Sequence, residues 1–369
     1  MYEDAVWMPF DFMHTFMAEA LKGVGVPEAD AKVCADVLIE ADKLGIDSHG
    51  IGRLKPIYYD RIKLGIMSPV TKIDVVKEGP TTAVLDGNNG MGHVIGVTAM
   101  NLAIEKAKKF GMGMVAVRNS THYGIAGYYC LMGAQAGMIG LTGTNARPSI
   151  APTFGVENML GTNPMSFGIP TDEPFPFLLD CATSVSQRGK IEVYDRLNKE
   201  LPAGWVIDRQ GRDRTDTHQI LKDLVSGEAA LTPLGGIGED HAGFKGYGYA
   251  TVVEILSAAL QGGAFLKALT GFSPEGKAQP YRLGHFFVAI DIEAFTSLNE
   301  FKKSTGDILR ALRASEKAPG ADRIYTAGEK EYMAWEYRKD KGVPVNAPLQ
   351  RDMIAIRNEL KLGYRFPFE

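Results

Sequence analysis

The spacing of apolar residues changes twice along this sequence, and no other feature constrains the fold as strongly. Apolar side chains recur at helical spacing over residues 10–21 and again after Pro27, a residue that suits the first turn of a helix. From about residue 80 short apolar strands alternate with helices, and helical patterns return near the end. We therefore predict that both ends of the chain pack together as a helical domain beside an α/β domain. The predicted boundaries are 1–79 and 296–369 for the helical domain and 80–295 for the α/β domain.

The individual elements follow from the same patterns. Strands are predicted at 83–85, 112–117, 138–142, 165–169, 177–180 and 286–291. Helices are predicted at 94–109, 127–136, 187–198, 247–261, 298–313, 329–341 and 347–361. Residues 200–243 are rich in glycine, aspartate and proline, so we predict a long functional loop there.

The composition argues against nucleic-acid and membrane partners. The formal net charge is −4, whereas a protein that binds nucleic acid usually presents a basic face. The N-terminal segment has early acids and no basic region before an apolar stretch, so we expect no signal peptide. The most apolar helical candidate, near residues 247–260, contains Glu254 and falls short of the ~20 residues that a membrane span needs.

The cysteines indicate a reducing compartment. Cys34, Cys130 and Cys181 lie far apart, are odd in number and form no CxxC pair. We therefore expect neither a disulfide framework nor a zinc-thiolate site, and a cytoplasmic location fits best. Each cysteine is expected to be a small buried apolar residue rather than a nucleophile.

A glycine-rich run is the closest match to a Rossmann fingerprint. Gly87, Gly90, Gly92 and Gly96 follow a predicted strand and precede a helix, but their spacing is not G-x-G-x-x-G. No acidic residue at a second strand end stands out as a partner for a ribose. Standard Rossmann binding is not supported, and a tight turn into a helix explains the glycines equally well.

The first candidate site lies in the segment 47–53, where a third helix is predicted to open. His49 and Arg53 are four residues apart and would share one helix face. A guanidinium there can bind a carboxylate through two parallel hydrogen bonds, and a histidine beside it can exchange a proton near neutral pH. Asp47 or Ser48 could instead be no more than the N-cap of that helix.

The second candidate follows the predicted strand 112–117. The loop from Arg118 to Gly127 contains His122 and several hydrogen-bonding residues, and strand ends that open into such loops are where open α/β sheets place ligands. The following helix offers free backbone N–H groups to an anion. His122 could alternatively be a loop residue that is bonded to the backbone.

Two further groups complete the candidates. Asp180 ends an apolar run and should be partly buried with a partner, because an unpaired buried carboxylate is costly. It could hold a histidine or a cofactor amide, or it could cap the helix that follows. Lys245 lies between glycines at a helix start, which suits a phosphate, although a tight turn also explains those glycines.

Taken together, these segments resemble the malate/L-lactate dehydrogenase family that is distinct from the Rossmann lactate and malate enzymes. The matching blocks, in order, are IDSHGIGR, RNSTHYGIAGYY, GTNPMSFGIP, LLDCATS, GKIEVY, PLGGIGE, FKGYG and YTAGEK. The resemblance implies a mixed-sheet, non-Rossmann NAD(P)-binding α/β fold with a helical domain. It also implies a homodimer whose sites lie near the subunit interface, and NAD or NADP as the cofactor.

The resemblance also assigns residues by position. It implies His122 as the acid/base, with His49 as the alternative and as a substrate contact, and Arg53 as the carboxylate ligand. Ser48, which would hydrogen-bond its neighbour histidine or the substrate, and Asp180 are the further catalytic candidates. The cofactor residues that it implies are His122, Tyr123, Gly124, Asn163, Asp180, Cys181, Ala182, Thr183, Lys245, Gly246, Gly328, Glu329 and Lys330. Relatives often carry a tyrosine shortly after the arginine, and here Tyr58 and Tyr59 both qualify.

The predicted function is hydride transfer between NAD(P) and C2 of a small 2-hydroxy or 2-oxo acid of the malate or L-lactate type. The alternatives are an NADPH-dependent cyclic imino acid reductase, a metal hydrolase that uses His49, His93, His122 and Asp180, and a non-catalytic nucleotide-binding protein. No H-x-x-x-H or similar spacing supports the hydrolase, so no metal is expected.

Two features of the ligands stay open at this point. A second cation would favour a dicarboxylate, and Arg147, Arg188 and Arg196 are unplaced options. Asp208 and Arg209 could accept either form of the coenzyme.

Overall fold

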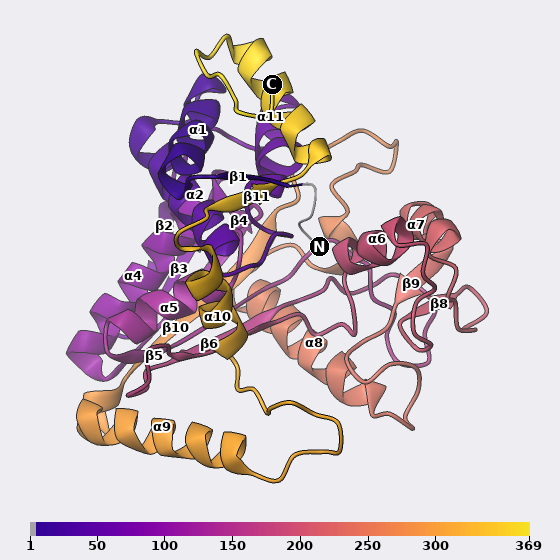
Figure 1. Cartoon of the computed structure of the whole chain (residues 1–369). Helices are drawn as coiled ribbons and strands as arrows, with labels where there is room; N and C mark the ends of the chain where they lie inside the picture. The colour runs from indigo at the N-terminus through magenta and orange to yellow at the C-terminus, as the bar shows by residue number, and fades with distance from the viewer. Residues whose placement is uncertain (1–4) are drawn as a thin grey trace.

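The computed structural model describes residues 5–369, and within them the centre of the molecule is a seven-stranded mixed sheet of order β2-β3-β4-β10-β5-β6-β7 (Figure 1). The strands are β2 (Asp74–Glu78), β3 (Thr82–Asp86), β4 (Met112–Ser120), β5 (Met138–Thr144), β6 (Met165–Ile169), β7 (Phe177–Cys181) and β10 (Leu283–Asp291). Strands β3 and β4 run parallel, and the neighbours that follow them in the sheet run antiparallel. A doubly wound Rossmann sheet is mostly parallel, so this topology confirms the predicted mixed, non-Rossmann fold.

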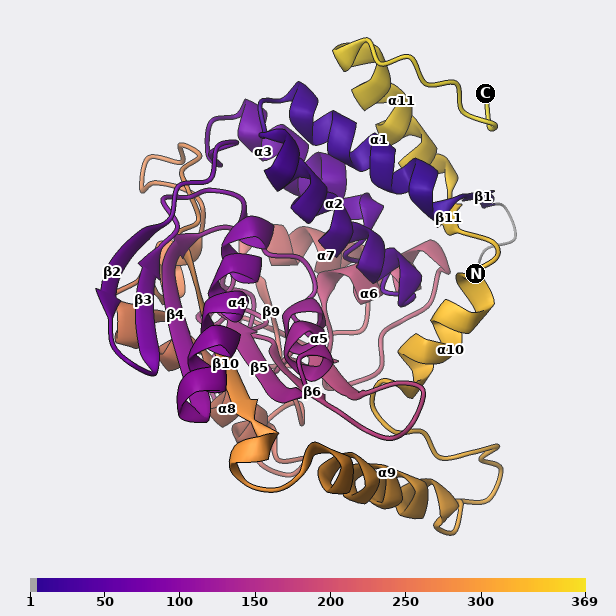
Figure 2. The same cartoon turned by 90° about the vertical axis from the view of Figure 1, so that its left-hand side faces the viewer.

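Helices cover both faces of the sheet (Figure 2). Helices α4 (Gly92–Phe110) and α5 (Gly127–Gln135) pack on one face, and α8 (Gly243–Ala258) packs on the other. The period-2 alternation of β10 accounts for this arrangement. Phe287 and Ala289 belong to the cluster under α4, whereas Phe286 and Val288 cluster with Val253 of α8.

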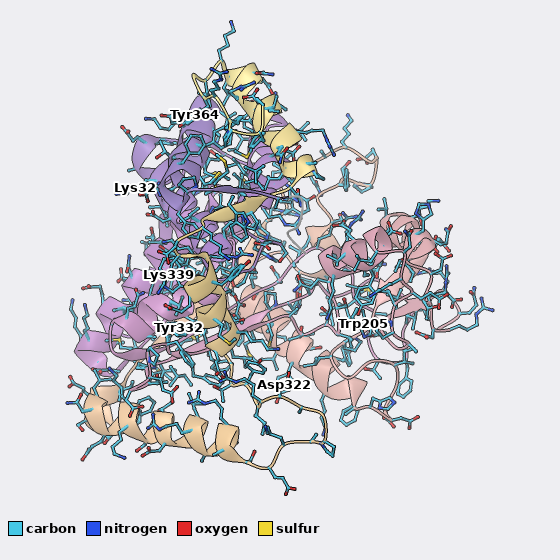
Figure 3. The ribbon with its side chains drawn as sticks, in the orientation of Figure 1. Lys32, Trp205, Asp322, Tyr332, Lys339 and Tyr364 are labelled. Atoms are coloured by element: carbon cyan, nitrogen blue, oxygen red, sulfur yellow. The ribbon has the colours of Figure 1, made fainter. Side chains whose placement is uncertain are left out.

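Segments from both ends of the chain form a helical unit above the sheet. β1 (Val6–Met8) pairs antiparallel with β11 (Val343–Val345), and α1 (Phe10–Gly23), α2 (Glu28–Lys43) and α11 (Ala347–Leu360) share one apolar core. Tyr364 lies beside α1 (Figure 3), and its ring centroid is 5.3 Å from that of Phe16. The ends therefore pack together as predicted, while the domain boundaries stay a prediction.

The linking segments are shorter helices. They are η1 (Ile51–Arg53), the π-helix η2 (Leu54–Tyr59), α3 (Asp60–Lys63), η3 (Ala259–Gln261), η4 (Leu266–Leu269) and η5 (Ile292–Ala294). α9 (Leu298–Ala314) lies at the opposite end of the molecule from α1 and α11 (Figure 2), where Arg310 pairs with Asp172. α10 (Glu329–Arg338) then returns past β7 toward the helical unit.

The predicted long loop at 200–243 is wrong, because this part of the chain forms a small lobe with its own core. The lobe contains α6 (Arg188–Arg196), β8 (Val206–Asp208), α7 (Thr217–Ser226) and β9 (Ala229–Leu231). Ile191, Val206 and Ile220 are fully buried in its core, near Trp205 (Figure 3). Strands of three residues are too short to show a period-2 pattern, so β8 and β9 could not be recognised within this polar part of the sequence.

The other predicted helices and strands are present within a few residues of their expected ends. Strands β1, β2 and β11 were not predicted. Across residues 5–369, no helix combines the length and the apolar character that spanning a membrane requires.

Candidate active site

The register of the sheet brings the candidate segments to one place. β3, β4, β5 and β7 end at the edge where β6 and β10 begin: Ser120 pairs with Leu283, and Met165 pairs with Cys181. We call this the site edge. The chain segments that follow β4, β5 and β7 all leave the sheet there. The second and third candidate groups, which follow β4 and β7, therefore share one edge.

The first candidate segment meets the second at the site edge. The ring centroids of His49 and His122 are 5.7 Å apart with an interplanar angle of 21°. Ser48 Oγ lies 2.9 Å from His49 Nδ1, and Tyr58 Oη lies 2.6 Å from His122 Nδ1. Three predicted site residues thus come together, and of the two candidate tyrosines it is Tyr58 that contacts them.

The prediction that His49 and Arg53 share one helix face is wrong. His49 lies in a turn, and the first helical element, η1, begins only at Ile51, so the two residues do not share a helix face through i, i+4 spacing. Arg53 is nevertheless adjacent, because its Nε donates to the backbone oxygen of Ser48 at 2.5 Å. Its two Nη atoms make no hydrogen bond within residues 5–369 and can receive a ligand.

The N-cap alternative for Asp47 and Ser48 is also wrong, since Gly50 precedes η1 and no side chain caps it. Asp47 instead pairs with Arg338 of α10, with Nη1–Oδ1 at 2.6 Å and Nη2–Oδ2 at 3.0 Å. Asp42 Oδ2 accepts from the N–H of Ile51 at 2.9 Å, and burial raises the pKa of this carboxyl to about 8. A Cβ on Gly50 would lie 1.8 Å from Asp42 Oδ1, so only glycine fits there. These contacts fix the segment that carries His49.

Desolvation lowers the pKa of both imidazoles. The pKa of His49 is lowered to about 4 by burial and then by the charge of Arg53. The pKa of His122 lies well below its ordinary value, through burial first and then through His49, His93, Arg61 and Arg53. Both rings are therefore neutral at pH 7, the state in which a histidine accepts a proton.

His122 presents one free nitrogen. Its Nδ1 is contacted by Tyr58 Oη at 2.6 Å and by the N–H of Gly124 at 3.2 Å. Its Nε2 has no hydrogen-bond partner in the described part of the chain, so this nitrogen can exchange a proton with a ligand.

Asp180 lies near the end of β7 and caps a helix. Its Oδ2 accepts from the N–H of Gly127, at the start of α5, at 2.7 Å, and its Oδ1 accepts from Ser166 Oγ at 2.6 Å. Burial raises the pKa of this carboxyl. Asp180 therefore caps α5 and not the helix that follows it, and it bonds no histidine among the residues described.

Three other predicted cofactor residues are buried and engaged in packing. Asn163 Nδ2 donates to Glu254 Oε2 of α8 at 2.8 Å, and Thr183 Oγ1 donates to the backbone oxygen of Asn163 at 3.0 Å. The Tyr123 ring stacks on Tyr129 and His285, at 4.8 and 4.4 Å between centroids. The Tyr123 side chain therefore points into the core, away from a ligand.

The starts of α8 and α10 lie beside β7. A Cβ on Gly246 would lie 2.1 Å from the oxygen of Leu234, whose N–H donates to Thr183 at 2.8 Å. A Cβ on Gly328 would lie 2.5 Å from the oxygen of Pro176. Glycine thus permits both helix starts to approach the β7 segment at backbone distance.

This region fits a dinucleotide by the chemistry of its donors. No side chain caps the start of α8 or α10, so free backbone N–H groups are available to phosphate oxygens. Lys245 and Lys330 are exposed, and neither forms an ion pair within residues 5–369. At the end of β7, Cys181 is exposed and Ala182 is half-buried, whereas the Glu329 carboxylate forms an ion pair with Arg323.

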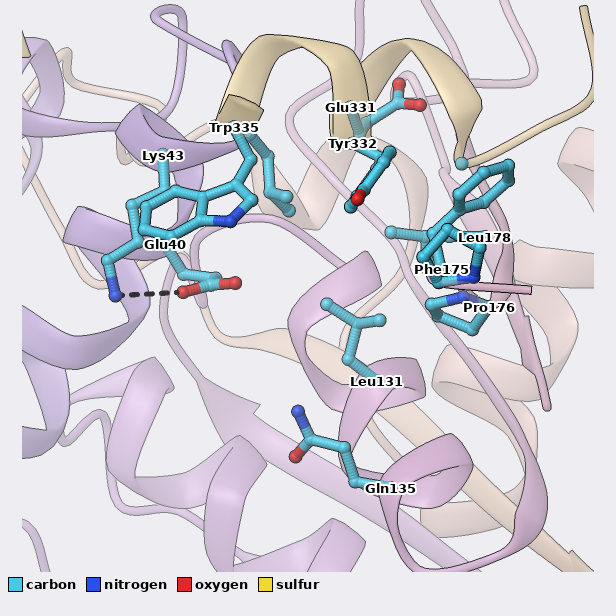
Figure 4. A pocket seen from close by; sticks show the side chains of 13 residues that line it. Glu40, Lys43, Leu131, Gln135, Phe175, Pro176, Leu178, Glu331, Tyr332 and Trp335 are labelled. Atoms are coloured by element: carbon cyan, nitrogen blue, oxygen red, sulfur yellow. Dashed lines mark ion pairs between the residues drawn. The ribbon is translucent and has the colours of Figure 1, made fainter. Parts of the chain in front are cut away.

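Cavity volume alone does not mark the site. One cavity, of about 240 Å³, lies between α2, α5 and α10 and is lined by Glu40, Phe175 and Trp335 (Figure 4). Another, of about 470 Å³, lies along α8. Neither is lined by His49 or His122. Within the described residues, no three His, Cys, Asp or Glu side chains gather as metal ligands.

Sequence reasoning missed one neighbour of this site, Arg61, and named another, His93, only as part of the metal-hydrolase alternative. The ring centroid of His93 lies 4.5 Å from that of Tyr58, and His93 is fully buried without a hydrogen-bond partner in residues 5–369. Arg61, one turn after Tyr58, acts on the pKa of His122. The glycine run before His93 is a turn into α4: a Cβ on Gly92 would lie 2.4 Å from the oxygen of His122.

Known proteins match this chain over nearly its whole length. The family model for malate/L-lactate dehydrogenase matches residues 8–354. Malate dehydrogenase of Pyrococcus horikoshii is 45% identical over 96% of this chain and 95% of its own. L-sulfolactate dehydrogenase of Methanocaldococcus jannaschii is 41% identical over 94% of each. The solved structure of malate dehydrogenase from Entamoeba histolytica superposes with a TM-score of 0.95 and 46% identity, covering 98% of this chain and 100% of its own.

Fold, site and relatives together define an oxidoreductase of the 2-hydroxy acid dehydrogenase class. The chain belongs to the malate/L-lactate dehydrogenase family, which confirms the resemblance found in the sequence. Membership implies a nicotinamide coenzyme.

Proposed function

We propose that the enzyme interconverts a small 2-hydroxy acid of the malate or L-lactate type and its 2-oxo acid, with His122 as the acid/base. The observation that carries this proposal is the convergence of His49, His122 and Tyr58 with the free Nη atoms of Arg53 at one edge of the sheet. A proton-transfer group and a carboxylate ligand side by side are what a 2-hydroxy acid requires.

In the oxidation direction, His122 Nε2 removes the proton of the C2 hydroxyl. For Nε2 to accept, Nδ1 must carry the ring proton and donate it to Tyr58 Oη at 2.6 Å, in place of accepting from the N–H of Gly124, and this hydrogen bond also orients the ring. When bound, the nicotinamide accepts or supplies the hydride. In the reduction direction the protonated ring returns its proton to the carbonyl oxygen. General acid/base catalysis of this kind contributes ~10²–10⁴ in rate.

Arg53 binds the C1 carboxylate through Nη1 and Nη2, and His49 and Ser48 contact the substrate beside it. Because Nε is held by the backbone of Ser48, the guanidinium plane is oriented before substrate arrives. A preoriented fork reduces the entropy that is lost on binding.

The coenzyme would be held along β7 and at the two uncapped helix starts. The residues proposed to hold it are His122, Gly124, Asp180, Cys181, Ala182, Thr183, Lys245, Gly246, Gly328, Glu329 and Lys330, with Asn163 acting behind them. Asp208 is a poor ribose ligand, because Arg212 Nε and Nη2 occupy its Oδ2 at 2.9 and 2.8 Å. Either NAD or NADP satisfies the chemistry, and the assay below separates them.

The test is a panel of 2-oxo acids assayed against NADH and NADPH by loss of the reduced nicotinamide's absorbance. We expect turnover of at least one acid, with one coenzyme preferred. Cyclic imino acids are included, because a preference for them would support an NADPH-dependent imine reductase instead. Loss of activity in the presence of a metal chelator would support a metal-dependent mechanism instead.

We also propose a homodimer that is formed through α8. Tyr249, Val252 and Ile255 recur at three-residue spacing on this helix and are 55%, 45% and 53% exposed, next to the apolar cavity along it. An apolar face of this kind is typical of a protein interface. We expect Ile255→Glu to shift a dimer toward monomer in light scattering. Wild-type protein that is already monomeric would contradict the proposal.

The cysteines support a cytoplasmic location. Cys34 and Cys130 are buried as expected, whereas the expectation of burial is wrong for Cys181, which is exposed at the end of β7; all three are free thiols. A free exposed thiol suits a reducing compartment.

A further inference from the structure

Arg338, the last residue of α10, is a buried cation that the proposed reaction does not use. Its side chain is 2% exposed. Its Nη1 and Nη2 donate to the two carboxylate oxygens of Asp47 at 2.6 and 3.0 Å, and Nη1 also donates to the backbone oxygen of Asp42, in the last turn of α2, at 2.5 Å. A buried ion pair usually adds no more stability than apolar packing would, but it can fix one relative position of the two segments that it joins. This pair joins the end of α10 to the segment that carries His49.

Asp47 directly precedes the residue that positions both proposed substrate ligands. Ser48 Oγ lies 2.9 Å from His49 Nδ1, and the backbone oxygen of Ser48 accepts from Arg53 Nε at 2.5 Å. A shift of Asp47 would therefore move the imidazole of His49 and the guanidinium of Arg53 together. Such shifts matter, because a misplacement of about 1 Å can cost ~10²-fold in rate.

The other end of α10 lies in the proposed coenzyme region. The helix begins after Gly328, where a Cβ would lie 2.5 Å from the oxygen of Pro176, and the N–H of Leu178 in β7 donates to the oxygen of Ala327 at 3.4 Å. Lys330, in the first turn, is exposed. A helix of ten residues is held by its own hydrogen bonds over about 15 Å, so a displacement of its start is carried to its end.

The middle of α10 lies over a cavity of about 240 Å³ (Figure 4). Tyr332 of α10 stacks on Phe175 with 5.2 Å between ring centroids, but the cavity separates Trp335 from Leu131 and Gln135 of α5. Close packing is what holds buried elements in one position, and a cavity lacks those contacts. The helix therefore has room to shift as one piece relative to α5.

We propose that Arg338 is a positioning residue through which the coenzyme prepares the substrate site. Phosphate groups bound at the start of α10 would fix the helix, and Arg338 and Asp47 would then fix the segment of His49 and Arg53. This inference rests on the proposed function, which places the coenzyme at α10 and the acid at Arg53. Because coupling between two binding sites is reciprocal, the acid must raise the affinity for the coenzyme by the same factor.

The test measures this factor by nicotinamide fluorescence. NADH or NADPH, whichever wild type prefers, is titrated with and without a saturating amount of the 2-hydroxy acid that wild type forms; both ligands are reduced, so no hydride is transferred. We expect the acid to lower the dissociation constant of the coenzyme about fivefold or more in wild type, and less than about twofold in Asp47→Asn. Without the acid, that dissociation constant should change less than about threefold, because the variant keeps the coenzyme ligands.

Asp172→Asn is the matched control. Asp172 also pairs through both carboxylate oxygens with an arginine at a helix, Arg310 of α9, at 2.9 and 3.1 Å, but this pair lies at the opposite end of the molecule from α1 and α11. The control should couple the two ligands as wild type does. Arg338→Lys keeps the charge but not the planar fork, so it should retain part of the coupling.

Three results would overturn the inference: wild-type coupling below about twofold, unchanged coupling in Asp47→Asn, or an equal loss in Asp172→Asn. If Arg338→Lys fails to fold, Asp47, whose side chain is 40% exposed, still tests the link. Wild-type enzyme that reduces no 2-oxo acid would refute the proposed function itself. Active wild type whose coupling does not depend on Asp47 would refute only the role of Arg338.

Discussion

The two halves of the candidate site are built by different means. On the substrate half, side chains make the site: Tyr58 contacts His122, the His49 ring stacks on that of His122, and Arg53 is fixed beside them by the backbone oxygen of Ser48. On the proposed coenzyme half, the backbone makes it, because glycines such as Gly246 let helix starts approach β7. The difference indicates that activity of the substrate half depends on which functional groups its side chains carry. The coenzyme half depends instead on the small size of its glycines.

The largest effect is expected at His122 on the substrate half. His122→Asn should lower kcat by roughly 10²–10⁴, because the proton-transfer group is lost. The dissociation constant of the coenzyme, measured by nicotinamide fluorescence, should hardly change. Near-normal turnover would indicate that His49 is the acid/base instead. A large loss of coenzyme binding would show that the substrate half and the coenzyme half are not separate.

The next effect is expected at Arg53. Arg53→Lys keeps the charge but not the planar fork, so KM for the acid should rise about 10- to 100-fold with a smaller change in kcat. Steady-state kinetics at saturating coenzyme measure both constants. An unchanged KM would mean that another cation holds the C1 carboxylate.

On the coenzyme half, adding one methyl group at a helix start should be enough to lower stability. Gly246→Ala should lower the free energy of unfolding by about 1–3 kcal/mol, because its Cβ would overlap the oxygen of Leu234. Gly248→Ala on the same helix is the matched control: no atom lies within 4 Å of its Cβ, so it should be neutral or stabilise by up to ~1 kcal/mol. Denaturant unfolding compares the pair. Equal behaviour would show that backbone approach does not limit this half.

The last effect is a pH dependence that belongs to the substrate half and appears only below pH 6.5. Burial lowers the pKa of His93 to about 3 from an unfolded value of 6.5, so the stability it contributes is complete above pH 6.5 and is lost as pH falls toward 3. Between pH 6.5 and about 3, this histidine lowers the free energy of unfolding by about 1.4 kcal/mol for each pH unit, and His93→Phe should abolish that decrease. Because neither ring nitrogen has a partner within residues 5–369, the variant should be as stable as wild type at pH 7.5. Parallel unfolding curves at all pH values would contradict this account.

Much of this architecture could be predicted from the sequence, and the exceptions have physical reasons. The longer helices have a clear apolar period, and α9, α10 and α11 begin at the predicted residues. The choice between Tyr58 and Tyr59 could not be predicted, because the π-helix η2 changes the rotation per residue, so spacing rules for an α-helix fail there. Arg61 and His93 become neighbours only through folding, and no local pattern reports such proximity.

The pairing of β1 with β11 has a consequence for biosynthesis. The helices that position His49 share a core with residues beyond 343, so they cannot acquire their final packing until the ribosome has made those residues. Contacts of such wide sequence separation slow folding, and a nascent chain would expose the apolar faces of α1 and α2 in the meantime. During synthesis, this enzyme should therefore depend on chaperones and become active only after the last helix has emerged.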